Sequence, residues 1–219
     1  MKTPANSWDF VAGALCLDFA NTVGGNRGGS CTETLGGFGD LAAWLRAANA
    51  LPVKTLRAIQ QRARERPQEA ARAFARAIEL REAVYRVASG LAASSPKRRN
   101  AARLRADLDL INDVLAEALF ATRLRPISRG FELAWDLAPP RPDQALWPIA
   151  RSAVDVLTSP RLARLRECAS ETCGWLFLDE TKNRSRRWCE MQSCGNRAKI
   201  RRFRQRRVPG KGFSRRPTR

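Results

Sequence analysis

The 219-residue sequence predicts a mainly α-helical protein: a helical N-terminal domain with a short β-hairpin, then a small C-terminal module made of a hairpin and a helix. Apolar residues recur at helical spacing through most of the first 160 residues. Four of the six cysteines stand in two pairs near the end of the chain, and a basic stretch with helical propensity follows the last of them. We therefore expect one domain at 1–160, a second at 161–207, and a basic, disordered tail at 208–219.

The first elements surround a glycine-rich segment. Residues 7–23 are largely apolar, which predicts a helix or a strand followed by a helix. Seven of the fourteen glycines lie between Gly24 and Gly39, which predicts a flexible loop. A nucleotide-binding turn is a weak alternative, because no strand and helix flank a GxGxxG pattern there. Asp40 is expected to cap the helix that follows.

Three longer helices are expected to form most of the core. The first runs from Pro52 to about Arg66, and the second begins at Pro67, a residue well suited to a first helical turn. The second helix carries an apolar stripe of Ala73, Ala77, Leu80, Val84, Val87 and Leu91. A break at 94–96 separates it from the third helix, which has Leu104, Leu108, Ile111 and Leu115 on one side. Short turns predict that these helices pack as neighbours.

The rest of the N-terminal domain combines a strand with a last helix. Apolar Phe131, Leu133 and Trp135 alternate with other residues after an Arg-Gly turn, which predicts a half-buried strand. Three prolines close this segment, and an apolar helix from about Gln144 to Leu157 leads to the cysteine module.

The cysteine module has the spacing of a metal site. Four residues lie between Cys168 and Cys173, fifteen residues follow, and Cys189 and Cys194 repeat the first spacing. Such pairs, separated by a hairpin-sized insert, are typical of one structural zinc ion with four thiolates, which close its coordination sphere. The insert predicts a strand at 175–179 and a return strand at 186–189, and the fourth cysteine begins a helix, so the module is treble-clef-like. Two disulfides, reduced cysteines without metal, and an iron–sulfur cluster remain alternatives.

The excess positive charge is concentrated beside this module. Of the net charge of +19, the segment from Lys182 to Arg219 contributes +14, with fifteen basic residues and one acid. Such a surplus favours a polyanion: nucleic acid first, an anionic membrane surface second. The candidate nucleic-acid contacts are Arg186, Arg187, Arg197, Lys199, Arg201, Arg202, Arg204, Arg206 and Arg207. We expect Ile200 and Phe203 to anchor this helix to the hairpin; a solvated helix face or a generally basic surface is the alternative.

Other features of the sequence limit the functions that are possible. The chain has no histidine, which removes the commonest general base and argues against an enzyme. Asp18, Asn21 and Thr22 stand in an apolar segment and either line a pocket for a small-molecule effector or form capping and turn hydrogen bonds. The absence of a signal region and of a long apolar run predicts a cytoplasmic protein that does not enter a membrane. A homodimer would suit a regulator, but no zipper-like seam identifies its interface.

Several motifs resemble a known family. The stretches CGWLFLD, NRSRRWC and CGNRAK resemble the CGNR zinc-finger family of bacterial proteins, and LCLDFANTV and LAAWL resemble its N-terminal ABATE domain. The resemblance spans about Leu15 to Arg207. It implies that Cys168, Cys173, Cys189 and Cys194 are the zinc ligands, and that the protein is a stress-induced transcription regulator whose finger binds DNA. RNA binding is the alternative function, followed by an enzyme with a zinc-stapled accessory domain.

Overall fold

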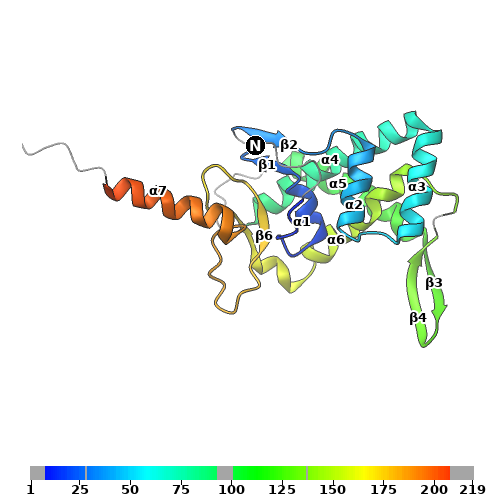
Figure 1. Ribbon diagram of the computed structural model, residues 1–219. Helices are drawn as coiled ribbons and strands as arrows, with labels where there is room; N and C mark the ends of the chain where they lie inside the picture. Colours follow the sequence, from blue (N-terminus) through cyan, green and yellow to red (C-terminus); the bar gives the residue numbers. More distant parts are fainter. Residues whose placement is uncertain (1–7, 28, 93–100, 137, 208–219) are drawn as a thin grey trace, which may run out of the picture.

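The computed structural model describes residues 8–27, 29–92, 101–136 and 138–207 and confirms a mainly α-helical fold (Figure 1). The helices are α1 Leu15–Ala20, α2 Phe38–Ala47, α3 Val53–Glu65, α4 Pro67–Leu91, α5 Ala101–Phe120, α6 Trp147–Leu157 and α7 Asn196–Arg207. Short turns of other helix types are η1 Pro142–Leu146, η2 Pro160–Arg164 and η3 Met191–Gly195. The break expected at 94–96 and the tail at 208–219 lie outside the described residues.

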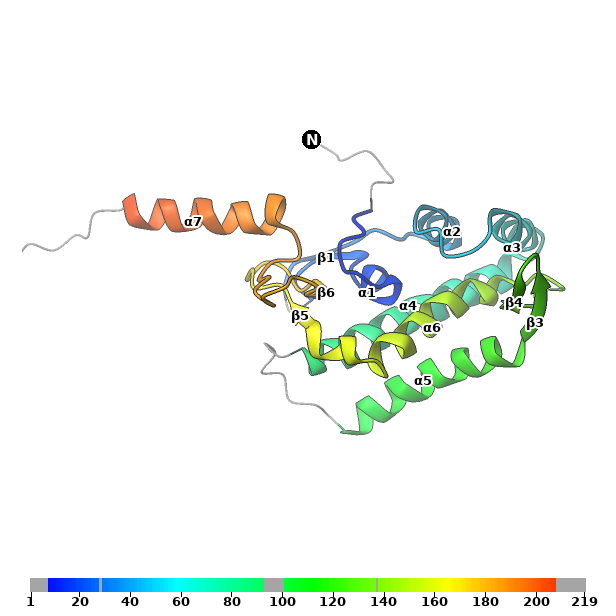
Figure 2. The same ribbon diagram turned by 90° about the horizontal axis from the view of Figure 1, so that it is seen from below.

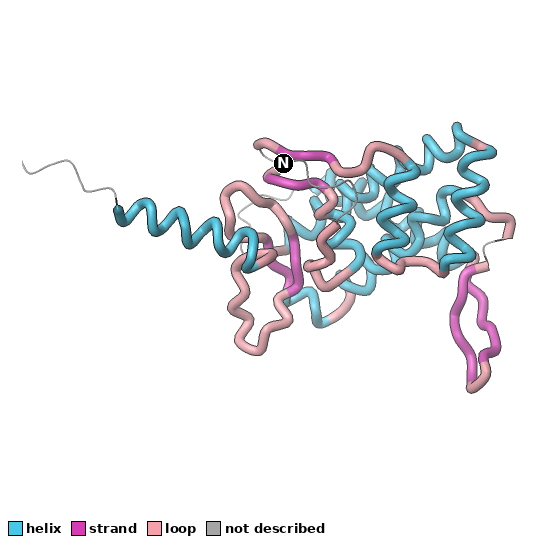
Figure 3. The backbone as a smooth tube through the Cα atoms, in the orientation of Figure 1, coloured by secondary structure: helices cyan, strands magenta, loops and turns pink. Residues whose placement is uncertain are grey.

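Three two-stranded antiparallel sheets complete the described fold. They pair β1 Val23–Gly25 with β2 Cys31–Glu33, β3 Thr122–Ile127 with β4 Gly130–Trp135, and β5 Leu165–Glu167 with β6 Leu176–Leu178. Each sheet is therefore a local ribbon at the edge of the helical body (Figure 3).

The core lies around α4. Helices α4 and α6 lie between α5 on one side and α1 to α3 on the other (Figure 2). The apolar stripe predicted on α4 is confirmed, since Ala77, Leu80 and Val84 are buried and face the neighbouring helices. Trp44 of α2 packs on Phe19 of α1 with ring centroids 5.0 Å apart, which fixes the short first helix on the body.

The stripe predicted on α5 is confirmed at Ile111 but is shifted by one position at Leu108 and Leu115. Leu108 is exposed, whereas Asp107, Ile111 and Val114 are buried. Asp107 can face inward because its carboxylate accepts a hydrogen bond from Arg86 Nε of α4 at 2.9 Å. A buried charge needs such a partner, and the hydrophobic pattern alone does not reveal it.

Two expectations for the glycine-rich segment are wrong. Part of it forms the β1–β2 hairpin, because ion pairs tie it to α4: Arg81 to Glu33 at 2.7 Å and Arg27 to Glu82 at 3.0 Å. Helix α2 begins before Asp40, whose carboxylate instead accepts the backbone N–H of Gly36 at 2.7 Å.

The strand expected at Phe131 to Trp135 exists as β4, but it is not half-buried. With β3 it forms a hairpin that projects from the body, and only its base at Trp135 packs against the core, where the ring lies 6.0 Å from that of Trp147. Gly130, at φ +108°, occupies the left-handed conformation that the turn requires.

Candidate metal centre and nucleic-acid interface

The four clustered cysteines come from three parts of the C-terminal module. Cys168 follows β5 and Cys173 precedes β6, so the connection between these strands holds the first pair. Cys189 lies in the long loop after β6, and Cys194 lies in η3 just before α7. All four side chains are buried, and their Sγ atoms lie within 4.8 Å of one another.

The spacing of the sulfurs fits one tetrahedral zinc ion. Cys173 Sγ lies 3.8 Å from Cys189 Sγ, and Cys189 Sγ lies 3.7 Å from Cys194 Sγ. A zinc–sulfur bond of about 2.3 Å in a tetrahedron separates the sulfurs by about 3.8 Å. Disulfides are excluded here, since all six cysteines are free. The space between sulfurs this close admits one ion and not a cluster of several irons and sulfides.

The shifts in the pKa values of the clustered thiols indicate why the cluster needs a cation. A hydrogen bond with Cys173 lowers the pKa of the Cys168 thiol, whereas the same contact raises the pKa of the Cys173 thiol. The pKa of Cys189 is also raised, chiefly by its hydrogen bond with Cys168. The cluster therefore retains protons on some sulfurs when it stands alone. A divalent cation replaces these protons, because the thiolate is the metal-binding form.

The residues after the fourth ligand stabilise the site. Gly195 leaves room for the Met191 side chain, whose sulfur would clash with a Cβ at this position. Asn196 Nδ2 donates to the Gln192 carbonyl at 3.0 Å and so holds the turn η3 on the start of α7. Arg197 Nη2 lies 3.0 Å from Cys194 Sγ and offsets part of the negative charge of four thiolates.

The return strand expected at 186–189 is wrong, because β6 pairs with β5 instead. The loop is held by the buried carboxylate of Asp179, which accepts N–H groups from Thr181 at 3.0 Å and Arg186 at 2.9 Å. Burial opposes ionisation of Asp179, but these hydrogen bonds prevail and lower its pKa. The Asp179 side chain thus accepts hydrogen bonds from this loop that a paired strand would otherwise accept.

The metal module is built into the N-terminal domain. Backbone N–H groups of Gly174 and Leu178 donate to the carbonyls of Gly25 at 3.1 Å and Ala12 at 2.8 Å. Trp175 Nε1 donates to the Val23 carbonyl at 3.0 Å. The two parts therefore share a seam of hydrogen bonds along β6.

Asn21 forms the centre of this seam. Its amide Nδ2 donates to the Leu176 carbonyl and its Oδ1 accepts the Leu176 N–H, both at 2.9 Å and both buried. The side chain thus satisfies a backbone position of β6 as a neighbouring strand would. The only sign of this role in the sequence is that a polar residue stands in an apolar segment.

We expect Asn21→Leu to lower the free energy of unfolding by about 2–4 kcal/mol, because it leaves both buried groups of Leu176 without partners. Denaturant unfolding of the zinc-loaded protein measures this change. Asn26→Ala is the matched control, since Asn26 Nδ2 also donates to the module, at the Glu171 carbonyl, but in an exposed place. Equal, small effects of the two substitutions would contradict a structural role for Asn21.

The other residues of the predicted effector pocket are buried and hydrogen-bonded. Asp18 Oδ1 accepts the N–H of Ala12 at 2.9 Å, and burial raises the pKa of its carboxyl to about 6. Thr22 Oγ1 donates to the Phe19 carbonyl at 2.8 Å. These contacts match the alternative of capping and turn bonds, and an effector role for Asp18, Asn21 and Thr22 stays a prediction.

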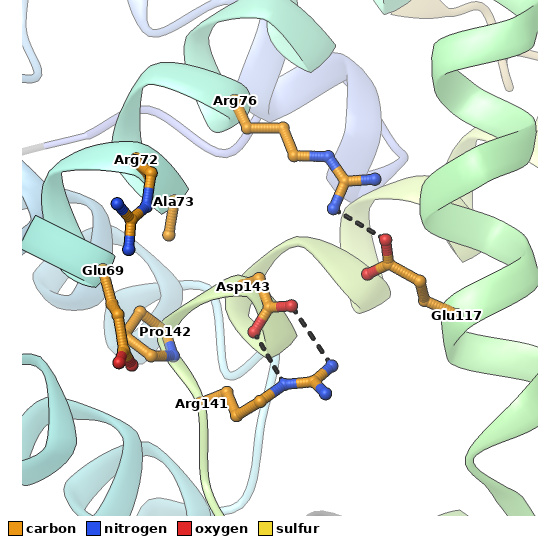
Figure 4. Close-up of a pocket in the computed structure, with 8 residues that line it drawn as sticks. All are labelled: Glu69, Arg72, Ala73, Arg76, Glu117, Arg141, Pro142 and Asp143. Atoms are coloured by element: carbon orange, nitrogen blue, oxygen red, sulfur yellow. Dashed lines mark hydrogen bonds and ion pairs between the residues drawn. The ribbon is translucent and has the colours of Figure 1, made fainter.

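A cavity of about 590 Å³ lies elsewhere, between α4, α5 and η1 (Figure 4). Its wall contains Glu69, Arg72, Ala73, Arg76, Glu117, Arg141, Pro142 and Asp143. Arg76 pairs with Glu117 at 2.8 Å and Arg141 with Asp143 at 3.2 Å. Because three cations and three carboxylates balance in this wall, the charges do not select an ionic ligand.

The predicted nucleic-acid residues divide into two groups. Arg186 faces inward: its guanidinium lies 4.3 Å from the centre of the Phe177 ring and donates to the carbonyls of Val11, Trp188 and Cys189. Its prediction as a phosphate contact is not supported, because its donors hold the loop around the metal site. Arg187 is exposed beside Trp188.

The remaining candidates lie on α7, which extends from the module into solvent (Figures 1 and 2). The expected anchoring of α7 by Ile200 and Phe203 is wrong, since these side chains are 52% and 55% exposed. The helix is held at its first turns instead, where it packs on η3 and Arg201 pairs with Glu171 at 2.9 Å.

One flank of α7 is turned away from the metal module. At 100° per residue, Arg197 and Arg201 share the flank that contacts Cys194 and Glu171. Lys199 and Arg202 lie on the other flank, are exposed, and form no ion pair with any residue that the structure describes. Arg204 is exposed, and Arg206 and Arg207 are the last residues of the helix.

None of the helices in the described ranges is both long and apolar enough to span a membrane. Residues 13–160 match the model of the ABATE family, described as "Putative stress-induced transcription regulator". Residues 164–207 match the model of the CGNR zinc finger. No curated protein matches the chain.

Proposed function

Because the chain belongs to the ABATE family and ends in a CGNR zinc finger, we propose that it is a transcription regulator that binds duplex DNA through α7. The observation that carries this proposal is the placement of the basic helix. The four-cysteine site lies at its first turn, and the helix extends into solvent away from the body. Its cations Lys199, Arg202 and Arg204 are exposed.

The helix has suitable dimensions for a DNA groove. Twelve residues at 1.5 Å each give a rod of about 18 Å, and an α-helix fits the major groove of B-DNA. Lys199 and Arg202, on the flank away from the module, are the first candidates for phosphate contacts. Arg204, further along the helix, is a candidate for phosphate or guanine contacts, since arginine binds either in a bidentate way.

The metal site contributes rigidity and not chemistry. Zinc bound by Cys168, Cys173, Cys189 and Cys194 has a closed shell of four thiolates, so no position is left for an activated water. Arg197 links that shell to the helix through Cys194. We infer a non-enzymatic protein that acts in the cytoplasm.

Salt dependence of binding tests the proposal. If about five phosphates are neutralised, the logarithm of the association constant should fall with the logarithm of salt concentration with a slope of about −4 to −5. Fluorescence anisotropy of a labelled duplex at several salt concentrations measures this slope. A slope near zero would exclude nucleic-acid binding by α7, and tighter binding of structured RNA at equal salt would favour the RNA alternative.

A further inference from the structure

The β3–β4 hairpin is the other element that projects from the body. It stands at the end of the molecule away from α7, and only its base contacts the helices (Figures 1 and 3). A two-stranded ribbon has marginal stability in water when both of its faces are exposed. Its apolar side chains therefore need an explanation.

The register of the hairpin places most of its apolar side chains on one face. Directly opposed residues of an antiparallel pair point to the same side. The opposed pairs Thr122–Trp135, Leu124–Leu133 and Pro126–Phe131 alternate with Arg123–Ala134 and Arg125–Glu132. One face is thus largely apolar and the other largely charged. We call the apolar one the arm face, defined by Leu124, Pro126, Phe131 and Leu133.

The arm face is open to solvent in the single chain. Leu124 is 64% exposed, and Phe131 and Leu133 are each 68% exposed. Their exposed parts sum to roughly 350 Å² of contiguous apolar surface, within the size range in which the largest patch of a monomer is often functional. No helix or strand of the described chain covers it.

We infer that the arm face is a homodimer interface, on which the arm face of a second copy of this chain packs. Two flat ribbons that each have one apolar face form a two-layer sandwich about 10 Å thick, and both charged faces remain in water. A two-fold axis between the copies brings the same surface of each copy into contact. The contact buries roughly 700 Å² of apolar area over both copies, and residues that flank the arm face must supply the remainder of a specific interface of about 1,200 Å².

The charge distribution favours a second copy as the occupant. Residues 119–136 contain three arginines and two acids, for a net charge of +1, whereas 182–219 contribute +14. Two copies therefore repel each other less where the arms meet than where their C-terminal segments would meet. This arrangement also leaves both α7 helices at the outer ends of the pair, free of the interface.

Sedimentation equilibrium of the full zinc-loaded chain, without nucleic acid and at about 0.5 M salt to suppress charge effects, tests this inference. We expect a dimer mass for the wild type over about 1–100 μM and a monomer mass for Phe131→Asp/Leu133→Asp. Glu132→Gln, on the opposite face of the same strand, is the matched control and should remain dimeric. A monomeric wild type, or a dimer that survives the double substitution, would overturn the inference.

A second variant covers the case in which the double substitution prevents folding. Phe131→Ala removes the largest side chain of the arm face and should weaken the dimer by about tenfold or more, with an unchanged melting temperature and one zinc per chain. An unchanged dissociation constant would also overturn the inference. If the wild type is monomeric and floats with phosphatidylcholine vesicles, the face binds lipid and the dimer is wrong. Because these measurements contain no DNA, they are independent of the proposed function.

Discussion

Replacing Cys194 by serine is expected to release the zinc ion and to unfold the C-terminal module. A serine hydroxyl is not ionised at neutral pH and does not replace a thiolate ligand. The module has three-residue strands and a long loop, so metal binding supplies most of its folding energy, as in zinc fingers, where it contributes about 10–16 kcal/mol. Loss of the ion also frees Arg197 and η3, which hold α7.

Elemental analysis measures the first effect and thermal unfolding the second. We expect zinc to fall from one ion per chain to almost none, and the melting temperature to decrease by more than about 10 °C, because β6 is hydrogen-bonded to α1 through Asn21. Cys31→Ser is the matched control, since Cys31 is exposed and lies outside the cluster. A Cys194→Ser protein that retains one tightly bound zinc would show that the ligand assignment is wrong.

Local patterns in the sequence predicted the long helices, β4 and β6, but not β1, β2 or β5, and not all of the strand partners. The stripe on α4 follows from helical periodicity and is correct, because its burial depends on spacing alone. The predicted partner of β6, the 186–189 segment, was wrong. The choice between this segment and β5 depends on long-range packing and on Asp179, whose carboxylate accepts hydrogen bonds from the loop. The exposed hairpin β3–β4 was expected to be half-buried for a related reason. Alternation predicts one apolar face but does not show what covers it.

The same limit applies to the functional site. The spacing of the cysteines predicted all four residues of the cluster, because each pair supplies half of a tetrahedron. The sequence could not distinguish Arg186 from its neighbour Arg187. Only the three-dimensional structure shows that Arg186 stacks on Phe177 and that Arg187 is exposed. Ile200 and Phe203 appeared to be anchors because apolar residues on a short helix usually are, but both side chains are about half exposed in the structure.

Reversing two charges on the free flank of α7 should abolish most nucleic-acid binding. The variant Lys199→Glu/Arg202→Glu replaces two attractive phosphate contacts with two repulsive ones and leaves the metal site and Arg197 intact. We expect an affinity loss of roughly 10²–10³-fold at about 0.1 M salt, and a salt slope that is less negative by about 2 or more. Anisotropy titrations of the same duplex measure both quantities.

The helix α3 offers a control with the same chemistry. Lys54 and Arg57 are exposed there with the same three-residue spacing, and Lys54→Glu/Arg57→Glu changes the net charge by the same amount. Because α3 lies at the far end of the body from α7, this variant should lose less than about threefold in affinity (Figure 1). Equal losses in the two variants would mean that total charge, and not α7, determines binding. A loss confined to the α7 variant, with zinc still at one ion per chain, would identify the metal-fixed helix as the element that contacts the nucleic acid.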